Sequence, residues 1–158
     1  RDRSVSRGLG DVYKRQASTI VTKREVIPYE QYHLDNAKLF EGDSIVYIQR
    51  IRYADATPIM IENNYYPCHK FSFLLTEPLD GSLYQLFREN YDICIGCSQN
   101  SYIDAVKAST EQANLLHISP GDPLFLFHTE MYDIHNELIH IGYEYICGSK
   151  YRFCYDNS

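Results

Sequence analysis

The sequence of 158 residues lacks the features that mark several large classes of protein. No apolar run approaches the roughly 20 residues that span a bilayer, so we expect no membrane segment. The N-terminus has no apolar core of the kind found in signal peptides. The five cysteines are an odd number, and without an export signal this favours free thiols and a reducing, cytoplasmic location.

The motifs that most directly indicate catalysis are also missing. There is no P-loop, no GxGxxG, no nucleophile elbow and no paired-carboxylate motif, although a catalytic triad assembled only in space would leave no sequence signal. Cys94-x-x-Cys97 lies in a strand-like run, where positions i and i+3 face opposite ways, and no second pair stands at ligand spacing. His128, His135 and His140 lack the i, i+4 spacing of a helical zinc site. We therefore predict no metal, no cofactor and no enzymatic activity.

Charge is unevenly distributed. The net charge is −6, yet residues 1–16 hold five basic and two acidic residues, so the remainder holds ten basic and nineteen acidic and is near −9. Such a domain is a poor direct partner for DNA, whose affinity comes largely from Lys and Arg neutralising phosphates. It is equally poorly suited to anionic lipid surfaces.

The first 16 residues, RDRSVSRGLGDVYKRQ, differ from the rest of the chain. They are polar, rich in Gly, Ser and Arg, and without periodicity, which predicts disorder. The stretch also resembles the translated adapter sequence found at the ends of fragmentary open reading frames, so it contributes nothing to the predicted fold. Residues 17–158 have a length typical of one domain.

One pattern occurs twice, at residues 41–66 and 120–145. Each copy follows a short helical pattern, opens with Gly-Asp, runs apolar to a Tyr, turns, and runs apolar again. Two joined helix–hairpin units predict a pseudo-symmetric antiparallel sheet.

Strands and helices are expected to alternate through the domain. The predicted strands are Ser18–Ile27, Asp43–Tyr53, Pro58–Tyr66, Ile93–Ala108, Leu124–Tyr132, Leu138–Cys147 and a last edge strand at Tyr151–Tyr155. The predicted helices are Gln31–Phe40, one that begins near Gly81–Ser82, and Ser109–His117.

The two copies differ in charge. The first hairpin carries Arg50 and Arg52, where the second has Thr129 and Met131, and residues at i, i+2 on a strand share a face. The arginines form either a solvent-facing stripe or an anion site, because guanidinium groups pair bidentately with carboxylate or phosphate. Side by side they repel each other unless an anion lies between them or carboxylates flank them. Glu62, on the return strand, is either an ion-pair partner or an acceptor for ligand hydroxyls.

Gly81-Ser82-Leu83-Tyr84 begins a predicted helix. Helix N-termini present free N–H groups that favour anions. An ordinary serine cap is the commoner role of such a residue, and the sequence leaves both interpretations open.

Several blocks, in this order, resemble the UTRA domain, the effector-binding half of HutC-type GntR transcriptional regulators. They are GDSIVYIQRIRYADATPI, ENNYYP, GSLYQLFRENYDI, EQANLLHISPGDPLFLFHTEMYD and the closing YRF. The resemblance covers about residues 18–155.

The resemblance implies a chorismate-lyase-like α+β fold, with an antiparallel sheet of about six strands, flanking helices, a small-molecule pocket between them, and a homodimer. It also implies that one group of side chains holds the acidic group of an effector, while a second group contacts the rest of the effector, which is polar. The first group is Arg50, Arg52, Ser82, Ser18 and Thr19; the second is Glu62 and Tyr84.

The sequence departs from the family pattern in two places. No winged helix-turn-helix precedes the domain, so DNA contact is expected only through an N-terminal domain outside this sequence. In GYEYICGSKYRF, Cys147 and Ser149 stand where many relatives have Arg and Asp, which leaves Glu144 as the one candidate of that strand.

The resemblance therefore predicts the ligand-sensing domain of a transcriptional repressor that responds to an anionic metabolite such as a phosphosugar. The alternative is an enzyme resembling chorismate lyase on the same fold, since arginines and a carboxylate also suit an aromatic dicarboxylate.

Overall fold

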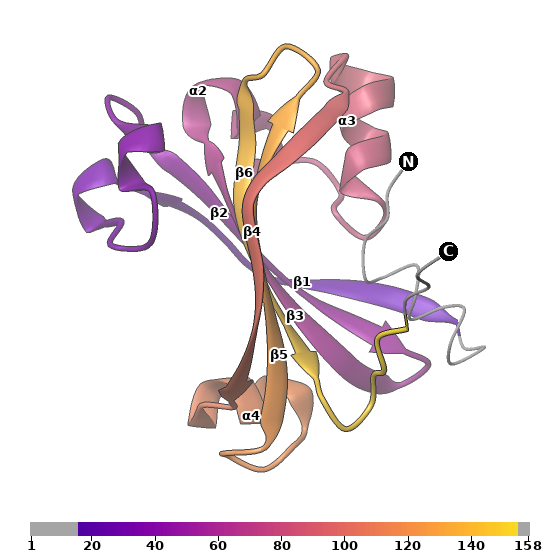
Figure 1. Ribbon diagram of the computed structural model, residues 1–158. Coiled ribbons are helices and arrows are strands. Elements are labelled where there is room, and N and C mark those ends of the chain that lie inside the picture. The colour runs from indigo at the N-terminus through magenta and orange to yellow at the C-terminus, as the bar shows by residue number, and fades with distance from the viewer. Residues whose placement is uncertain (1–15, 155–158) are drawn as a thin grey trace.

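The computed structural model describes residues 16–154, whose strands form a single antiparallel sheet in the order β1-β2-β3-β6-β5-β4. The sheet is strongly twisted (Figure 1). The predicted leader, residues 1–16, lies outside the described residues except for Gln16, which exchanges hydrogen bonds with Asp55. The strands are β1 (Ala17–Ile27), β2 (Ile45–Ala54), β3 (Thr57–Pro67), β4 (Ile95–Lys107), β5 (Pro123–Asp133) and β6 (Leu138–Cys147).

The predicted internal repeat is visible in the sheet. The halves β1-β2-β3 and β4-β5-β6 meet where β3 pairs with β6. Arg50 lies opposite Glu62 in the first hairpin, and Thr129 lies opposite Gly142 in the second. These two cross-strand pairs therefore occupy corresponding places in the two halves.

Short helices cover both faces of the sheet. They are η1 (Tyr29–Gln31), η2 (Ala37–Phe40), α2 (Cys68–Phe71), η3 (Ser72–Leu75), α3 (Leu83–Tyr91) and α4 (Thr110–Leu116).

One face is covered by α2, η3 and α3. Ile48 and Tyr66 of the sheet pack with Phe71 of α2 and Phe87 of α3, and all four side chains are buried. The rings of Tyr66 and Phe87 meet edge to face, with centroids 5.9 Å apart. This packing holds α3 against that face of the sheet.

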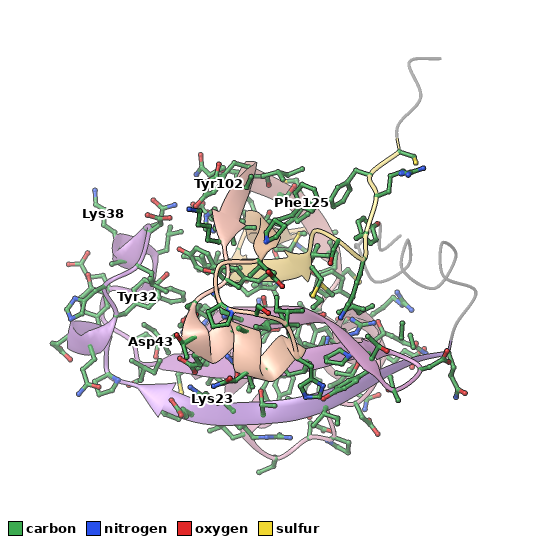
Figure 2. The ribbon with its side chains drawn as sticks, turned by 90° about the horizontal axis from the view of Figure 1, so that it is seen from below. Lys23, Tyr32, Lys38, Asp43, Tyr102 and Phe125 are labelled. Carbon is green, nitrogen blue, oxygen red and sulfur yellow. The ribbon has the colours of Figure 1, made fainter. Side chains whose placement is uncertain are left out.

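The opposite face is covered by α4, which lies across the strands in Figure 2. Its Ala113 and Leu116 pack on Ile61 and Leu124 of the sheet. Towards the other end of that face, η1 and η2 contribute a second buried cluster. None of the helices within residues 16–154 is long and apolar enough to cross a membrane.

Two of the three predicted helix starts are confirmed. Ser82 caps α3, its Oγ accepting a hydrogen bond from the Gln85 N–H. Ser109 caps α4, where it forms a reciprocal capping box with Gln112. Side-chain acceptors at these positions satisfy N–H groups that the first helical turn leaves without partners.

The predicted helix Gln31–Phe40 is wrong. The segment instead ends in the 3₁₀ turn η2, which follows a turn at residues 35–36, and only its first residue, Gln31, belongs to η1. Asn36 adopts a left-handed conformation (φ 55°), and its side-chain amide donates to the carboxylate of Glu130 on the sheet. Asp35 accepts from the Tyr143 hydroxyl. Asp and Asn compete with helical hydrogen bonds, and here contacts with the sheet replace them.

The predicted edge strand Tyr151–Tyr155 is also wrong as far as residue 154; Tyr155 lies outside the described residues. After β6 the chain turns, with Lys150 N–H bonded to the Cys147 carbonyl. Phe153 then packs against Phe125 and Phe127 of β5, so ring contacts take the place of strand pairing. The described sheet edges are β1 and β4.

Candidate functional site

Two adjoining hollows lie beside the start of α3. The smaller, of about 250 Å³, is lined by the beginning of β1 together with β2, β3 and β6. The larger, of about 960 Å³, extends between α3 and the strands β4, β5 and β6. Five residues line both hollows: Asn64, Ser82, Tyr84, His140 and Glu144. A molecule lodged there would contact both halves of the pseudo-symmetric sheet.

All eight site residues predicted from the sequence line the smaller hollow. They come from four strands and the start of α3, so they are far apart in the chain and meet only through the fold. They are Ser18, Thr19, Arg50, Arg52, Glu62, Ser82, Tyr84 and Glu144. Their part in holding a ligand stays a prediction.

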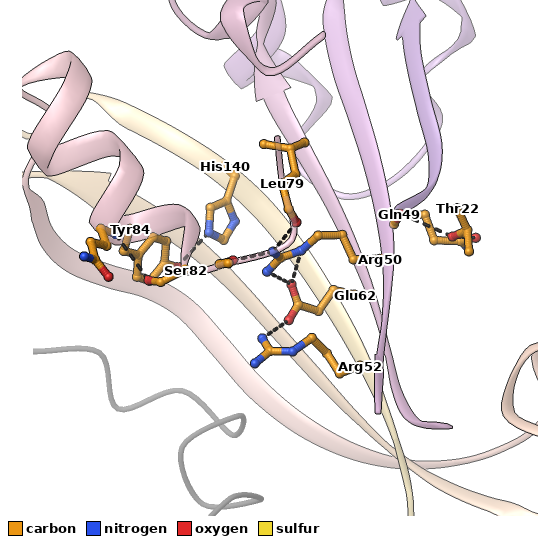
Figure 3. A network of polar contacts seen from close by, with 11 residues as sticks. Thr22, Gln49, Arg50, Arg52, Glu62, Leu79, Ser82, Tyr84 and His140 are labelled. Atoms are coloured by element: carbon orange, nitrogen blue, oxygen red, sulfur yellow. Dashed lines mark hydrogen bonds and ion pairs between the residues drawn. The ribbon is translucent and has the colours of Figure 1, made fainter. Parts of the chain in front are cut away.

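Glu62 lies between the two arginines (Figure 3). Its Oε1 accepts from Arg50 Nη2 at 2.8 Å and from Arg50 Nε at 3.2 Å. Its Oε2 accepts from Arg52 Nη1 at 2.9 Å. Glu62 is thus the internal anion that allows two guanidinium groups to sit side by side, and of its two predicted roles it takes that of ion-pair partner.

Arg50 is occupied by the fold itself. Besides Glu62, its Nη1 donates to the carbonyls of Leu79 at 2.9 Å and Gly81 at 2.8 Å. Four of the five N–H groups of a guanidinium are therefore engaged. Arg50 holds the loop before α3 against the sheet and has little capacity left for a ligand.

Arg52 is placed differently. Glu62 is its one hydrogen-bonding partner among the described residues, and its Nε is buried with no partner there. Its side chain is 18% exposed, and Thr19 of β1 lies directly opposite it in the sheet. Since its remaining N–H groups are not engaged, Arg52 is the stronger candidate of the two to hold an anion.

Burial and the two arginines shift the pKa of Glu62 in opposite directions. Burial alone would raise the pKa of the Glu62 carboxyl, but the charges of Arg50 and Arg52 and their hydrogen bonds outweigh it and lower that pKa. The group is therefore ionised at pH 7, and with its two arginines it leaves one net positive charge beside the hollow.

His140 is a residue of this site that the sequence did not reveal. The sequence offers it only as a zinc ligand of unsuitable spacing, yet its Nε2 lies 2.8 Å from the Tyr84 hydroxyl, and it lines both hollows. Alternation along β6 places His140, Gly142 and Glu144 on one face. The sequence could have shown that these three residues share a face. Only the pairing of β6 with β3 shows that this face lies beside Glu62 and Asn64.

The model of the UTRA domain family matches residues 13–152. The chain belongs to the UTRA domain family. Solved structures agree at the level of the fold. PhnF from Mycobacterium smegmatis superposes with a TM-score of 0.84 at 18% identity, over 98% of this chain and 68% of that one. A GntR-family transcriptional regulator from Enterococcus faecalis V583 superposes with a TM-score of 0.75 at 24% identity, over 88% of this chain and 99% of that one.

YydK from Bacillus subtilis has the same fold, with a TM-score of 0.79 at 17% identity. The match covers 93% of the UTRA domain described here and 64% of the YydK chain, so this chain spans less than two thirds of that relative. The predicted chorismate-lyase-like α+β architecture is confirmed.

Family membership makes this chain an effector-binding regulatory domain rather than an enzyme of the same fold. The alternative of a chorismate-lyase-like enzyme is therefore not supported. The hollows beside α3 are the natural candidates for its effector site, since they gather every residue that the family resemblance selected.

Proposed function

We propose that this UTRA domain binds a small acidic metabolite, with the acidic group held by Arg52. The observation that carries the proposal is the buried Nε of Arg52, which has no partner among the described residues and lies beside a hollow. Hydroxyls of Thr19 and Ser82 line the same hollow. Hydrogen bonds from a guanidinium to a carboxylate or phosphate are among the strongest that proteins form.

The remaining charges of the smaller hollow restrict the ligand further. Asp80 and Glu144 also line it, so its lining as a whole is not positive. An acidic group fits only at the end formed by Arg52, while the two carboxylates suit hydroxyl groups elsewhere on the ligand. Glu144 lines both hollows and is a candidate to contact those hydroxyls. A phosphosugar or a sugar acid has this combination.

The domain would act within a HutC-type repressor, as a homodimer in the cytoplasm, with DNA bound by a separate N-terminal domain. Family membership and the greater length of the YydK and PhnF chains support this arrangement. An effector moves such a protein between two states only as far as its affinities for the two states differ.

A thermal-shift screen tests the proposal directly. Inorganic phosphate, glucose 6-phosphate and gluconate are compared with neutral glucose and cationic glucosamine. A ligand that binds only the folded state raises the melting temperature, so the acidic compounds should do so and the others should not. Stabilisation by glucose or glucosamine alone would show that the ligand is not acidic.

The role of Arg52 is tested by substitution. Arg52→Gln should weaken binding of the best acidic ligand by about 1.5–3 kcal/mol in titration calorimetry, the scale of hydrogen bonds to charged groups. Arg152→Gln is the control, because Arg152 is exposed and lines neither hollow. Equal affinities for Arg52→Gln and the wild type would refute the assignment.

A further inference from the structure

Gly142 allows two polar side chains to approach the backbone of β6 closely where the two halves of the sheet meet. Gly142 of β6 pairs with Asn64 of β3 and lines the larger hollow. A Cβ at position 142 would lie 2.8 Å from Asn64 Oδ1 and 3.1 Å from His140 Nδ1. Its φ is not in the left-handed region, so space rather than backbone conformation requires glycine. We call this feature, formed by Gly142, Asn64 and His140, the Gly142 notch.

His140 brings an unused polar atom to this notch. The side chain is almost fully buried, at 4% exposure, and Nε2 is engaged by Tyr84. Nδ1 is buried and has no hydrogen-bond partner among the described residues. A buried polar atom without a partner is unfavourable, and this one lies close to Gly142, which lines the larger hollow.

The imidazole is neutral at physiological pH. Burial lowers the pKa of His140 to about 4, against the smaller opposing effect of the Glu62 charge. A neutral ring has one N–H and one free lone pair, and the Tyr84 hydroxyl can complement either at Nε2. Nδ1 is accordingly a donor or an acceptor, and a hydroxyl group satisfies it in both cases. Where Nδ1 donates, the same hydroxyl can also donate to Asn64 Oδ1.

The internal symmetry explains why this notch is uncharged. The pair Thr129–Gly142 in the second half corresponds to the pair Arg50–Glu62 in the first. Where the first half has an ion pair, the second has a hydroxyl side chain and a glycine. This cross-strand position is therefore uncharged, although Arg88 and Glu144 also line the larger hollow, and His140 lines both hollows.

We propose that the Gly142 notch binds a hydroxyl group of the effector whose acidic group is held at Arg52. This inference rests on the proposed function and adds a recognition element to it. His140 and Asn64 select a hydroxylated ligand over one of the same size and charge that lacks hydroxyls, because that ligand leaves their polar atoms without partners.

Matched ligand pairs test this selection by titration calorimetry on the chain of residues 1–158. One pair is glucose 6-phosphate and cyclohexylmethyl phosphate; the other is gluconate and hexanoate. Inorganic phosphate reports on the acidic end alone. In at least one pair, the wild type should prefer the hydroxylated member by about tenfold or more, which corresponds to one net hydrogen bond.

Two variants remove the notch in different ways. His140→Phe keeps a ring but removes both nitrogens, whereas Gly142→Ala keeps the nitrogens of His140 but places a methyl group against Asn64 and His140, so that their side chains must shift. In either variant the preference for the hydroxylated ligand should fall to about threefold or less, because most of the free energy of that hydrogen bond is lost. The affinity for inorganic phosphate should stay unchanged. His135→Phe makes the same change at an exposed histidine that lines neither hollow, and it should keep the full preference.

The outcomes separate the two proposals. If folded His140→Phe and Gly142→Ala both retain the wild-type preference, the notch is not a hydroxyl site, although acidic binding at Arg52 stands. If the wild type binds both members of each pair equally, the inference fails in the same way. If the wild type binds none of these anions, the proposed function fails and this inference fails with it.

Discussion

Glu62 joins two cationic side chains where water has little access. Its side chain is 7% exposed and that of Arg50 only 5%. Removing one member of a buried ion pair leaves an uncompensated charge and costs about 3–5 kcal/mol. Glu62→Gln should therefore lower the free energy of unfolding by about 3 kcal/mol or more, as measured by urea denaturation.

The same substitution at an exposed ion pair provides the control. Glu111 lies 3.4 Å from Lys23, and its side chain is 68% exposed. Glu111→Gln should change the stability by less than about 1 kcal/mol, as exposed pairs do. Similar losses in the two variants would mean that the Arg50–Glu62–Arg52 cluster does not stabilise the fold.

His140 predicts a dependence of stability on pH. Burial lowers its pKa to about 4, below the ordinary value of 6.5, so the unfolded chain binds the proton more readily than the folded one. The stabilisation is complete above pH 6.5 and is lost as the pH falls towards 4. Between pH 7 and pH 5, His140 should account for a loss of about 2 kcal/mol in the free energy of unfolding.

His140→Phe isolates this contribution. Urea denaturation of the wild type and the variant at pH 7 and pH 5 gives the part of the loss that belongs to this side chain. The variant should lose about 2 kcal/mol less than the wild type over that interval. Identical losses would indicate that His140 takes up a proton without unfolding.

At the scale of elements, the N-terminus of α3 has two roles. Ser82 caps the helix through Oγ and also lines both hollows. Aspartate caps helices about as well as serine but carries a negative charge. Ser82→Asp should therefore leave the melting temperature nearly unchanged and weaken binding of the best acidic ligand by about tenfold or more in calorimetry, through repulsion at short range.

The cap of α4 supplies the matched control. Ser109 makes the same hydrogen bond, to the N–H of Gln112, and lines neither hollow. Ser109→Asp should preserve both stability and ligand affinity. If Ser82→Asp binds the acidic ligand as tightly as Ser109→Asp does, no acidic group binds near the start of α3.

The elements that could be predicted are those with local signals. Both hairpins follow from apolar runs separated by turn residues, and both helix starts follow from serine caps. The segment 31–40 has an apolar periodicity that suits a helix, but Asn36 and Asp35 bond to the sheet instead. Contacts between residues about a hundred positions apart leave no local signal.

The site was predictable to a similar extent. The arginines and Ser82 stand in recognisable blocks, and the fold brings them together. Arg50 is less available to a ligand than Arg52 because it donates to the carbonyls of Leu79 and Gly81. No side-chain pattern in the sequence indicates these backbone contacts. The Gly142 notch likewise depends on the pairing of β3 with β6, which fixes which residues share its walls.

At the scale of the whole molecule, the sheet is continuous across its two halves, and the site lies where they meet. Burial on both faces ties the halves together, so a ligand that contacts Arg52 in one half and His140 in the other connects the two. Binding there shifts the domain between two arrangements only as far as the ligand's affinities for them differ.

The overall charge predicts how the chain behaves towards DNA. The net charge is −6, and residues 16–158 alone carry −9, since residues 1–15 hold five basic and two acidic residues. Nonspecific affinity for DNA comes from cations that displace counterions from the phosphates. Fluorescence anisotropy with a labelled duplex in about 150 mM salt should therefore detect no binding at protein concentrations up to about 100 μM, the weak end of nonspecific affinities.

A chain that begins at Gln16 separates the leader from the domain in this measurement. It should bind no more DNA than the full chain, because removing residues 1–15 removes three net positive charges. Saturable binding by this shorter chain, weakening with added salt, would mean that the acidic domain contains a basic DNA-binding surface of its own. DNA recognition would then not depend on a separate domain, and the proposed division of the regulator into a sensing part and a DNA-binding part would be wrong.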